Sequence, residues 1–210
     1  MIFKICGLKK SESLFCCEEN NVDFFGMIFY EKSPRNITFT EAETLITTSK
    51  EMRIRPVGVF VDHEINDLKK IISSLRLEYI QLHGSENQLY IDEIKKQFDA
   101  KIIKKISINN SEDLIKIDKF NNIEYLLFDY KPANNELPGG NSKTFDWNLL
   151  KGQKIKLPWF ISGGINETNI KKIQNLLNPD GIDLSSGVEV SKGIKSNSKI
   201  NNLFKKFYDN

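Results

Sequence analysis

The sequence predicts an α/β protein that folds as a single-domain (β/α)8 TIM barrel over residues 1–210. Short β-rich apolar runs alternate with longer helical patterns along the chain, and such alternation is typical of parallel strands joined by right-handed crossovers. The runs number eight, which suits a closed barrel, whereas a doubly wound open sheet needs only about five or six strands. No linker or break in composition indicates a second domain.

Eight apolar runs have the length and residue types of buried strands. In chain order, they are Ile2–Cys6, Phe24–Phe29, Arg55–Val61, Tyr79–Leu82, Lys101–Ile106, Tyr125–Asp129, Leu157–Ile161 and Gly181–Leu184. Helical segments follow them, most clearly at residues 64–75 and 87–98, where apolar residues recur three and four positions apart. Ser111 and Asn166 are the expected starts of the helices after the fifth and seventh strands. Residues 131–143 form the longest polar loop, and residues 185–193 are expected to add one short helical turn.

The composition excludes several classes of function. With 30 basic and 28 acidic residues the net charge is +2, which argues against nucleic acid or an anionic membrane as the main partner. No apolar run approaches the ~20 residues of a membrane span, and no signal-peptide core is present, so we expect a cytoplasmic protein. Cys6, Cys16 and Cys17 lack the spacing of a disulfide framework or zinc site, and the last two fit packing within the first helix.

Residues capable of chemistry gather at the ends of the predicted strands, where the active sites of such barrels lie. Cys6, Arg35, His83 and Asp129 end or follow the first, second, fourth and sixth strands. Glycine-containing runs follow the seventh and eighth strands, and their backbone N–H groups can approach an anion closely. Loops at these two positions form the common phosphate site of the fold. The sequence therefore predicts a phosphate-binding site at the mouth of the barrel.

Eight spaced blocks of sequence carry a resemblance to a known family. The first four strands contribute KICGL, SPR, VGVF and QLHG, and the second half of the chain contributes LLFD, GGNSKTFDW, ISGGIN and DLSSGVE. In this order the blocks resemble phosphoribosylanthranilate isomerase over essentially the whole chain. The resemblance implies an aldose–ketose isomerase, without metal or organic cofactor, that performs the third step from chorismate to tryptophan. Its reaction would be the Amadori rearrangement of N-(5-phosphoribosyl)anthranilate, a small-molecule substrate, to 1-(2-carboxyphenylamino)-1-deoxyribulose 5-phosphate.

The resemblance also implies roles for individual residues. The family's general base falls on Cys6 and its general acid on Asp129, while Arg35 matches the arginine for the anthranilate carboxylate and His83 the histidine of the fourth strand. The phosphate loops and their neighbours complete the substrate-binding set, namely Gly163, Gly164, Asp183, Ser185, Ser186 and Gly187. A cysteine base must be a thiolate, so we expect positive charge from Lys4 or Arg35 to lower the pKa of Cys6.

Two departures from the family pattern concern loops. The run Gly139-Gly140-Asn141-Ser142-Lys143 lacks the family's third glycine, and we expect this to stiffen the loop and to change substrate closure or product release. Ser196 stands after Lys195, where the family often has aspartate, and we expect the loss of a helix cap or a loop anchor.

Two rival functions are weighed against this reading. A sugar-phosphate isomerase with paired carboxylates would want aspartate where the first strand ends in Cys6. A catalytically retired barrel that senses a phosphorylated ligand would be expected to lack the acid or the base, and both are present. A monomer and a homodimer are equally compatible with the sequence, and so is acceptance of the related histidine-pathway substrate.

Overall fold

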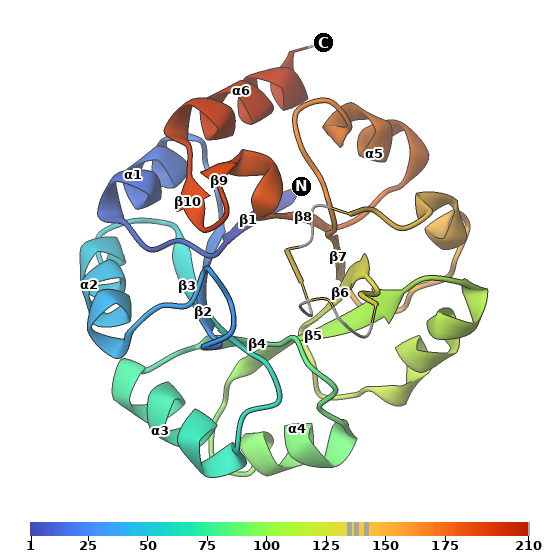
Figure 1. Cartoon of the computed structure of the whole chain (residues 1–210). Helices are drawn as coiled ribbons and strands as arrows, with labels where there is room; N and C mark the ends of the chain where they lie inside the picture. Colours follow the sequence, from blue (N-terminus) through green and yellow to red (C-terminus); the bar gives the residue numbers. More distant parts are fainter. Residues whose placement is uncertain (134–135, 137–138, 141–142, 210) are drawn as a thin grey trace.

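The computed structural model describes residues 1–133, 136, 139–140 and 143–209. Eight parallel strands pair in chain order, and β1 also pairs with β8, which closes the barrel. The strands are β1 (Ile2–Cys6), β2 (Phe24–Phe29), β3 (Arg55–Phe60), β4 (Tyr79–Leu82), β5 (Lys101–Ile108), β6 (Tyr125–Tyr130), β7 (Trp159–Ile161) and β8 (Gly181–Leu184). The predicted (β/α)8 barrel is therefore confirmed, and Figure 1 shows its strands as an inner ring surrounded by the helices.

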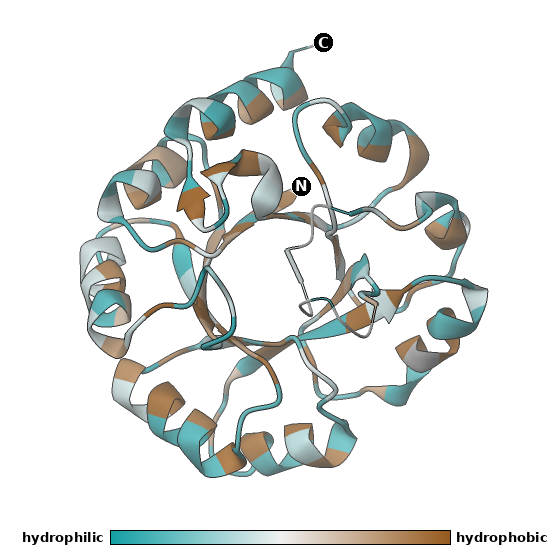
Figure 2. Ribbon diagram, in the orientation of Figure 1, coloured by the Kyte–Doolittle hydropathy of each residue, from teal (hydrophilic) through white to brown (hydrophobic). Residues whose placement is uncertain are grey.

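The strands are followed by α-helices and 3-10 helices. They are α1 (Ser11–Glu19), α2 (Phe39–Ser49), α3 (Ile65–Leu75), α4 (Gln88–Lys95), η1 (Ser111–Lys119), η2 (Trp147–Leu150), α5 (Ile170–Leu176), η3 (Ser186–Val188) and α6 (Asn197–Tyr208). The apolar stripes of these helices face the strands, as Figure 2 shows by their hydrophobic inner sides. Cys16 and Cys17 of α1 are buried in the apolar cluster between strands and helices, as predicted, and so are Trp147 of η2 and Trp159 of β7.

Several predicted boundaries are wrong by a few residues. β7 begins at Trp159 rather than Leu157, because Pro158 has no N–H to donate to the ladder. The segment after β5 is a 3-10 helix whose N-cap is Asn110, not Ser111. α5 begins later than expected, with Asn169 at its N-cap position. The Asn166 side chain accepts from the backbone N–H and hydroxyl of Thr168 and so caps the turn that precedes α5.

A short hairpin after β8 was not predicted. Following η3, β9 (Glu189–Ser191) pairs antiparallel with β10 (Ile194–Lys195), and the turn contains Gly193 at a φ of +85°. The hairpin stands at the carboxyl end of the barrel, beside β1 and β8 in Figure 1. It brings the side chains of Glu189 and Lys195 to the mouth.

The barrel interior is filled by its own apolar cluster, separate from the one between strands and helices. It consists of Cys6, Phe24, Val57, Val59, Tyr79, Ile103, Leu127 and Phe160. Side chains alternate between the two faces of each strand, so residues two positions from these members also point inward. Lys4, Gln81 and Asp129 occupy such positions and are buried, which places polar groups directly above the apolar filling.

Candidate active site

One cavity of about 60 Å³ opens at the carboxyl ends of the strands. Six of the ten predicted site residues line it, namely Cys6, Arg35, His83, Asp129, Asp183 and Ser185. They come from β1, the loop after β2, the end of β4, β6, β8 and the loop that follows β8. The fold thus brings most of the predicted site residues together around one cavity.

Cys6 ends β1 with its side chain on the inner face, 6% exposed. Gly26 lies opposite on β2, and a Cβ there would stand 2.8 Å from the Cys6 Sγ, so glycine leaves the room that the thiol occupies. Gly7 adopts a φ of +83°, a conformation that suits glycine, and a Cβ there would meet the Arg35 Cδ at 2.8 Å. The pair Cys6-Gly7 therefore ends the strand and lets the arginine side chain pass beside it.

The expected lowering of the Cys6 pKa is wrong. Burial raises the pKa of the Cys6 thiol, and the positive charges of Lys4 and Lys195 oppose this only in part. Lys4 is fully buried two residues earlier on the same strand and donates to Oδ1 of Asp183 over 2.9 Å. The negative charge of Asp183 itself disfavours the thiolate. Desolvation is the dominant effect here, which the sequence pattern did not reveal.

Asp129 on β6 accepts one backbone hydrogen bond and lies close to the His83 ring. Its Oδ1 accepts from the backbone N–H of Tyr130 over 2.8 Å, and its Oδ2 lies 3.5 Å from Nε2 of His83. The other ring nitrogen of His83, Nδ1, lies 2.8 Å from the amide nitrogen of Gln81 on β4. The carboxyl group is thus held in place by the backbone of β6 and an imidazole from the end of β4.

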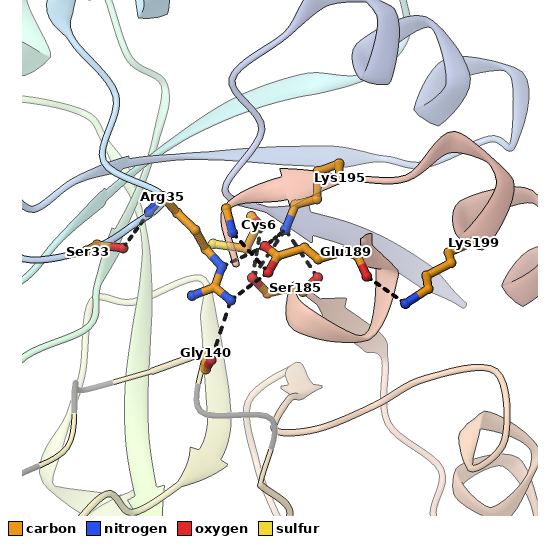
Figure 3. A network of polar contacts seen from close by, with 9 residues as sticks. Cys6, Ser33, Arg35, Gly140, Ser185, Glu189, Lys195 and Lys199 are labelled. Atoms are coloured by element: carbon orange, nitrogen blue, oxygen red, sulfur yellow. Dashed lines mark hydrogen bonds and ion pairs between the residues drawn. The ribbon is translucent and has the colours of Figure 1, made fainter. Parts of the chain in front are cut away.

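Arg35 is buried in an ion-pair network. Its Nε and Nη2 donate to the two carboxylate oxygens of Glu189 over 2.7 and 2.8 Å. Lys195 donates to the same carboxylate over 2.7 Å and also to the carbonyl oxygen of Ser185. Figure 3 shows these three charged side chains pointing toward one another beside Cys6. Nη2 also donates to the carbonyl oxygen of Gly140 over 3.4 Å, so Nε and Nη2 are already engaged and Nη1 is left.

Three of the four predicted phosphate-loop residues line a different cavity from Cys6 and Asp129, and Gly163 lines neither. Gly164, Ser186 and Gly187 line a second cavity of about 490 Å³, together with Lys199. A Cβ at Gly187 would stand 1.9 Å from the carbonyl oxygen of Ile165, so the loops after β7 and β8 pack backbone against backbone. Gly163 adopts a φ of +92°, and a Cβ there would lie 3.0 Å from Oδ1 of Asp129, so the loop after β7 runs beside Asp129.

Two glycines of the segment after β6, Gly139 and Gly140, line the cavity. A Cβ at Gly139 would lie 2.5 Å from Nε2 of His83, and a Cβ at Gly140 would lie 2.2 Å from Nη1 of Arg35. Glycine at both positions permits this close approach. The expected effect of the missing third glycine concerns Asn141 and Ser142, which lie outside the described residues.

The loss of a helix cap at Ser196 is also a wrong prediction. Ser196 is the N-cap of α6, and its Oγ accepts from the backbone N–H of Lys199 over 3.3 Å. Serine is as good an N-cap as aspartate because its oxygen satisfies the same orphan N–H group. The start of α6 is therefore retained in this chain.

Five polar or glycine residues of the site were missed by the sequence analysis, namely Gly26, Gln81, Glu189 and Lys195, and Lys4 as a partner of Asp183. For Lys4 and Gln81 a signal existed, because each stands two residues before a predicted site residue on the same strand face. Glu189 and Lys195 carried none, since the hairpin that positions them was not predicted.

Comparison with known proteins gives a consistent result. Residues 3–206 match the family model described as N-(5'-phosphoribosyl)anthranilate (PRA) isomerase. The N-(5'-phosphoribosyl)anthranilate isomerase of Zymomonas mobilis is 39% identical over 199 residues, covering 94% of this chain and 93% of that protein.

Two solved structures are similar over nearly the whole chain. A phosphoribosylanthranilate isomerase in complex with reduced 1-(o-carboxyphenylamino)-1-deoxyribulose 5-phosphate has a TM-score of 0.83 at 27% identity, covering 98% of both chains. A monomeric form of the dimeric enzyme from Thermotoga maritima also has a TM-score of 0.83, at 28% identity and 98% coverage of both chains.

Proposed function

Because the chain belongs to the N-(5'-phosphoribosyl)anthranilate isomerase family, we propose that Cys6 is the general base and Asp129 the general acid of its reaction. The protein is an isomerase of tryptophan biosynthesis that acts on N-(5'-phosphoribosyl)anthranilate. The observation that carries the residue assignment is the shared cavity, which is lined by the thiol and the carboxyl group together.

The chemistry requires one group to give a proton and another to take one. Protonation of the ring oxygen by Asp129 allows the bond from C1 to that oxygen to break, while the anilino nitrogen forms a C1=N iminium. Removal of the C2 proton by the Cys6 thiolate then gives an enolamine, and transfer of the O2 proton to C1 gives the ketose. Both side chains are nearly buried, and exclusion of water protects the reactive iminium.

Arg35 is the proposed contact for the anthranilate carboxylate, through Nη1 rather than through a two-pronged contact. Glu189 accepts from Nε and Nη2, and Nη2 also donates to the carbonyl oxygen of Gly140 over 3.4 Å, so Nη1 is the nitrogen left for the substrate carboxylate. Arg35 and Lys195 together outweigh the single charge of Glu189 by one unit, which favours an anion beside them. His83, Asp183 and Ser185 are further proposed contacts, because they line the same cavity.

The phosphate is proposed to bind the backbone of the loops after β7 and β8, at Gly163, Gly164, Ser186 and Gly187. Backbone N–H groups at glycine-containing turns suit an anion.

Ligand pockets typically measure ~300–1,000 Å³, whereas the cavity lined by Cys6 and Asp129 measures about 60 Å³. Gly139 and Gly140 line this cavity, with their backbone close to His83 and Arg35.

The test is a pair of substitutions followed by single-turnover measurements of the loss of anthranilate fluorescence. Cys6→Ala removes the base and Asp129→Asn the acid, and each should lower kcat by several orders of magnitude, because each proton transfer contributes about 10²–10⁴-fold. Binding of the reduced product analogue should be preserved in both. Cys17→Ala, a buried thiol of α1, is the matched control and should keep its kcat. Near-parental turnover by Cys6→Ala would remove the cysteine from the mechanism.

The proposed setting is the cytoplasm, because a free thiol that serves as a base needs a reducing compartment. Among the described residues, no helix is both long and apolar enough to cross a bilayer.

We propose no nucleic-acid partner, since the net charge of the chain is nearly balanced at +2. Monomer and homodimer are the two proposed states, and sedimentation equilibrium decides between them.

A further inference from the structure

Three side chains form a chain of contacts across the cavity wall, from Gln81 through His83 to Asp129. The amide nitrogen of Gln81 lies 2.8 Å from Nδ1 of His83, and Nε2 of His83 lies 3.5 Å from Oδ2 of Asp129. Gln81 and His83 stand two residues apart on the inner face of β4, and both line the cavity. Gln81 is fully buried and Asp129 is 5% exposed, so neither contact competes with bulk water.

The contact with Gln81 determines which ring nitrogen of His83 carries the proton. An amide NH2 group can only donate, so Nδ1 must offer its lone pair. Burial lowers the pKa of His83, with a further lowering from the charge of Lys105 on β5, while Asp129 on β6 and Asp183 on β8 act in the opposite direction. The ring is therefore neutral near pH 7, and its single proton is on Nε2, directed at Asp129.

The other end of the Gln81 amide lacks a partner among the described residues. Its Oε1 is buried and accepts no hydrogen bond, and an unsatisfied buried acceptor typically costs about 1–3 kcal/mol. Buried polar groups are nearly always paired in native proteins. Gln81 lines the cavity, so a hydroxyl group of a bound ligand is a suitable hydrogen-bond donor to its Oε1.

We propose that Gln81 is both a substrate contact and a positioning residue: its Oε1 accepts a hydroxyl of the bound sugar, and its amide N–H holds His83 as the Nε2–H tautomer. Through that tautomer Gln81 orients the carboxyl group of Asp129. The catalytic part of this inference rests on the proposed role of Asp129, whereas the tautomer part stands on the contacts alone. The inference gives a role to both the Nε2 and the Oε1 of Gln81, whereas the proposed roles of Cys6 and Asp129 give a role to neither.

The tautomer is read directly by ¹⁵N–¹H NMR of the histidine ring, because the chain has only two histidines. His63→Gln removes the other signal and assigns the spectrum. The parent should show a protonated Nε2 and an unprotonated Nδ1. Gln81→Glu replaces the donor by a carboxylate that can only accept, and it should protonate Nδ1. Gln81→Met, a neutral variant of similar length, should give exchange between the two tautomers.

The substrate contact and the positioning role are read by kinetics and binding. Gln81→Met should lower kcat by roughly tenfold or more, a part of what a general acid contributes. It should also weaken binding of the reduced product analogue about 5- to 30-fold, while inorganic phosphate binds as before because it has no sugar hydroxyl.

Each result decides one part. A parent Nδ1 that carries the proton, or a Gln81→Glu variant whose Nδ1 does not, would overturn the tautomer assignment. Unchanged analogue binding by a folded Gln81→Met variant would overturn the sugar contact, and unchanged kcat would overturn the positioning role. Loss of the proposed role of Asp129 would appear separately, as an active Asp129→Asn variant in an otherwise parental tautomer background.

Discussion

Replacing Glu189 by glutamine removes a negative charge that serves two buried cations at once. Its carboxylate accepts from Nε and Nη2 of Arg35 and from Nζ of Lys195 over 2.7–2.8 Å. The side chains of all three residues are at most 4% exposed. The amide of Glu189→Gln keeps the shape of the side chain and one acceptor oxygen, but it leaves both cations without a counter-charge.

The expected effect follows from burial. Breaking a buried ion pair by removing one partner typically costs about 3–5 kcal/mol, because an uncompensated charge stays behind. Domains of this kind are stable by only ~5–15 kcal/mol, so Glu189→Gln should lose a large fraction of its stability. Nη1 of Arg35 should also lose its fixed direction, so the variant should raise KM for the substrate more than it lowers kcat.

The stabilising effect of Glu189 should depend on pH. Burial acts to raise the pKa of Glu189, but the hydrogen bond from Arg35 and the charge of Lys195 outweigh it, so the pKa is lowered. A carboxyl group with a lowered pKa stabilises the folded state above its unfolded pKa, and this contribution is lost as the pH falls through the folded pKa. The difference between parent and Glu189→Gln should therefore be complete above about pH 5 and shrink in more acidic solution.

Urea unfolding, followed by circular dichroism at pH 7 and at pH 4, measures this difference. Asp67→Asn is the matched control, because Asp67 pairs with Lys70 on the surface of α3, where both side chains are more than 60% exposed. Exposed pairs contribute about 0–1 kcal/mol, so the control should remain near the parent. A loss below about 1 kcal/mol for Glu189→Gln at pH 7 would refute the reasoning, since the network would then behave like a surface pair.

Three further outcomes are expected. Burial raises the pKa of Cys6, and the proposed base acts as a thiolate, so kcat/KM should keep rising with pH to above the ordinary thiol pKa of about 8.5. Lys4→Met should move that rise to higher pH. A kcat/KM profile that is flat from pH 7 to 10 would contradict the role of the thiolate. Gly26→Ala should displace the thiol, whose Sγ would lie 2.8 Å from the new Cβ, and lower kcat at least tenfold, with iodoacetamide labelling of Cys6 as an independent readout. Gly187→Ala should force apart the loops after β7 and β8 and raise KM, and an unchanged inhibition constant for inorganic phosphate would contradict the phosphate assignment.

Strand order and most of the strand boundaries could be predicted from the sequence because each buried parallel strand is a short apolar run. The helical layer was harder. Residues 111–119 carry apolar residues at helical spacing, yet they form a 3-10 helix, since the spacing of three is shared by both helix types. The caps were misplaced by one to three residues, because several Ser and Asn residues stand side by side there and each is an acceptable N-cap.

Cys6 and Asp129 could be singled out from the strand ends as candidate residues, whereas the ion pair of Lys4 with Asp183 could not be predicted. A polar side chain that alternates with apolar ones, such as Lys4 between Phe3 and Ile5, normally indicates a solvent-facing position. In a closed barrel the inner face is also enclosed, so Lys4 is fully buried and pairs with Asp183, which is 179 positions away in the sequence. Pairing of this kind depends on closure between β1 and β8, which no local pattern contains.

The raised pKa of Cys6 is compatible with its role as a base, although the sequence analysis expected the opposite. Near neutral pH each unit of increase reduces the thiolate fraction about tenfold. The thiolate that remains is a stronger base, and with a Brønsted coefficient of about 0.5 each unit returns about threefold in rate. The net loss is therefore only about threefold per unit. Lys4 and Lys195 limit the rise, and the burial that causes it also keeps water away from the iminium. A buried thiol held between two paired lysines is thus a workable base at the end of β1.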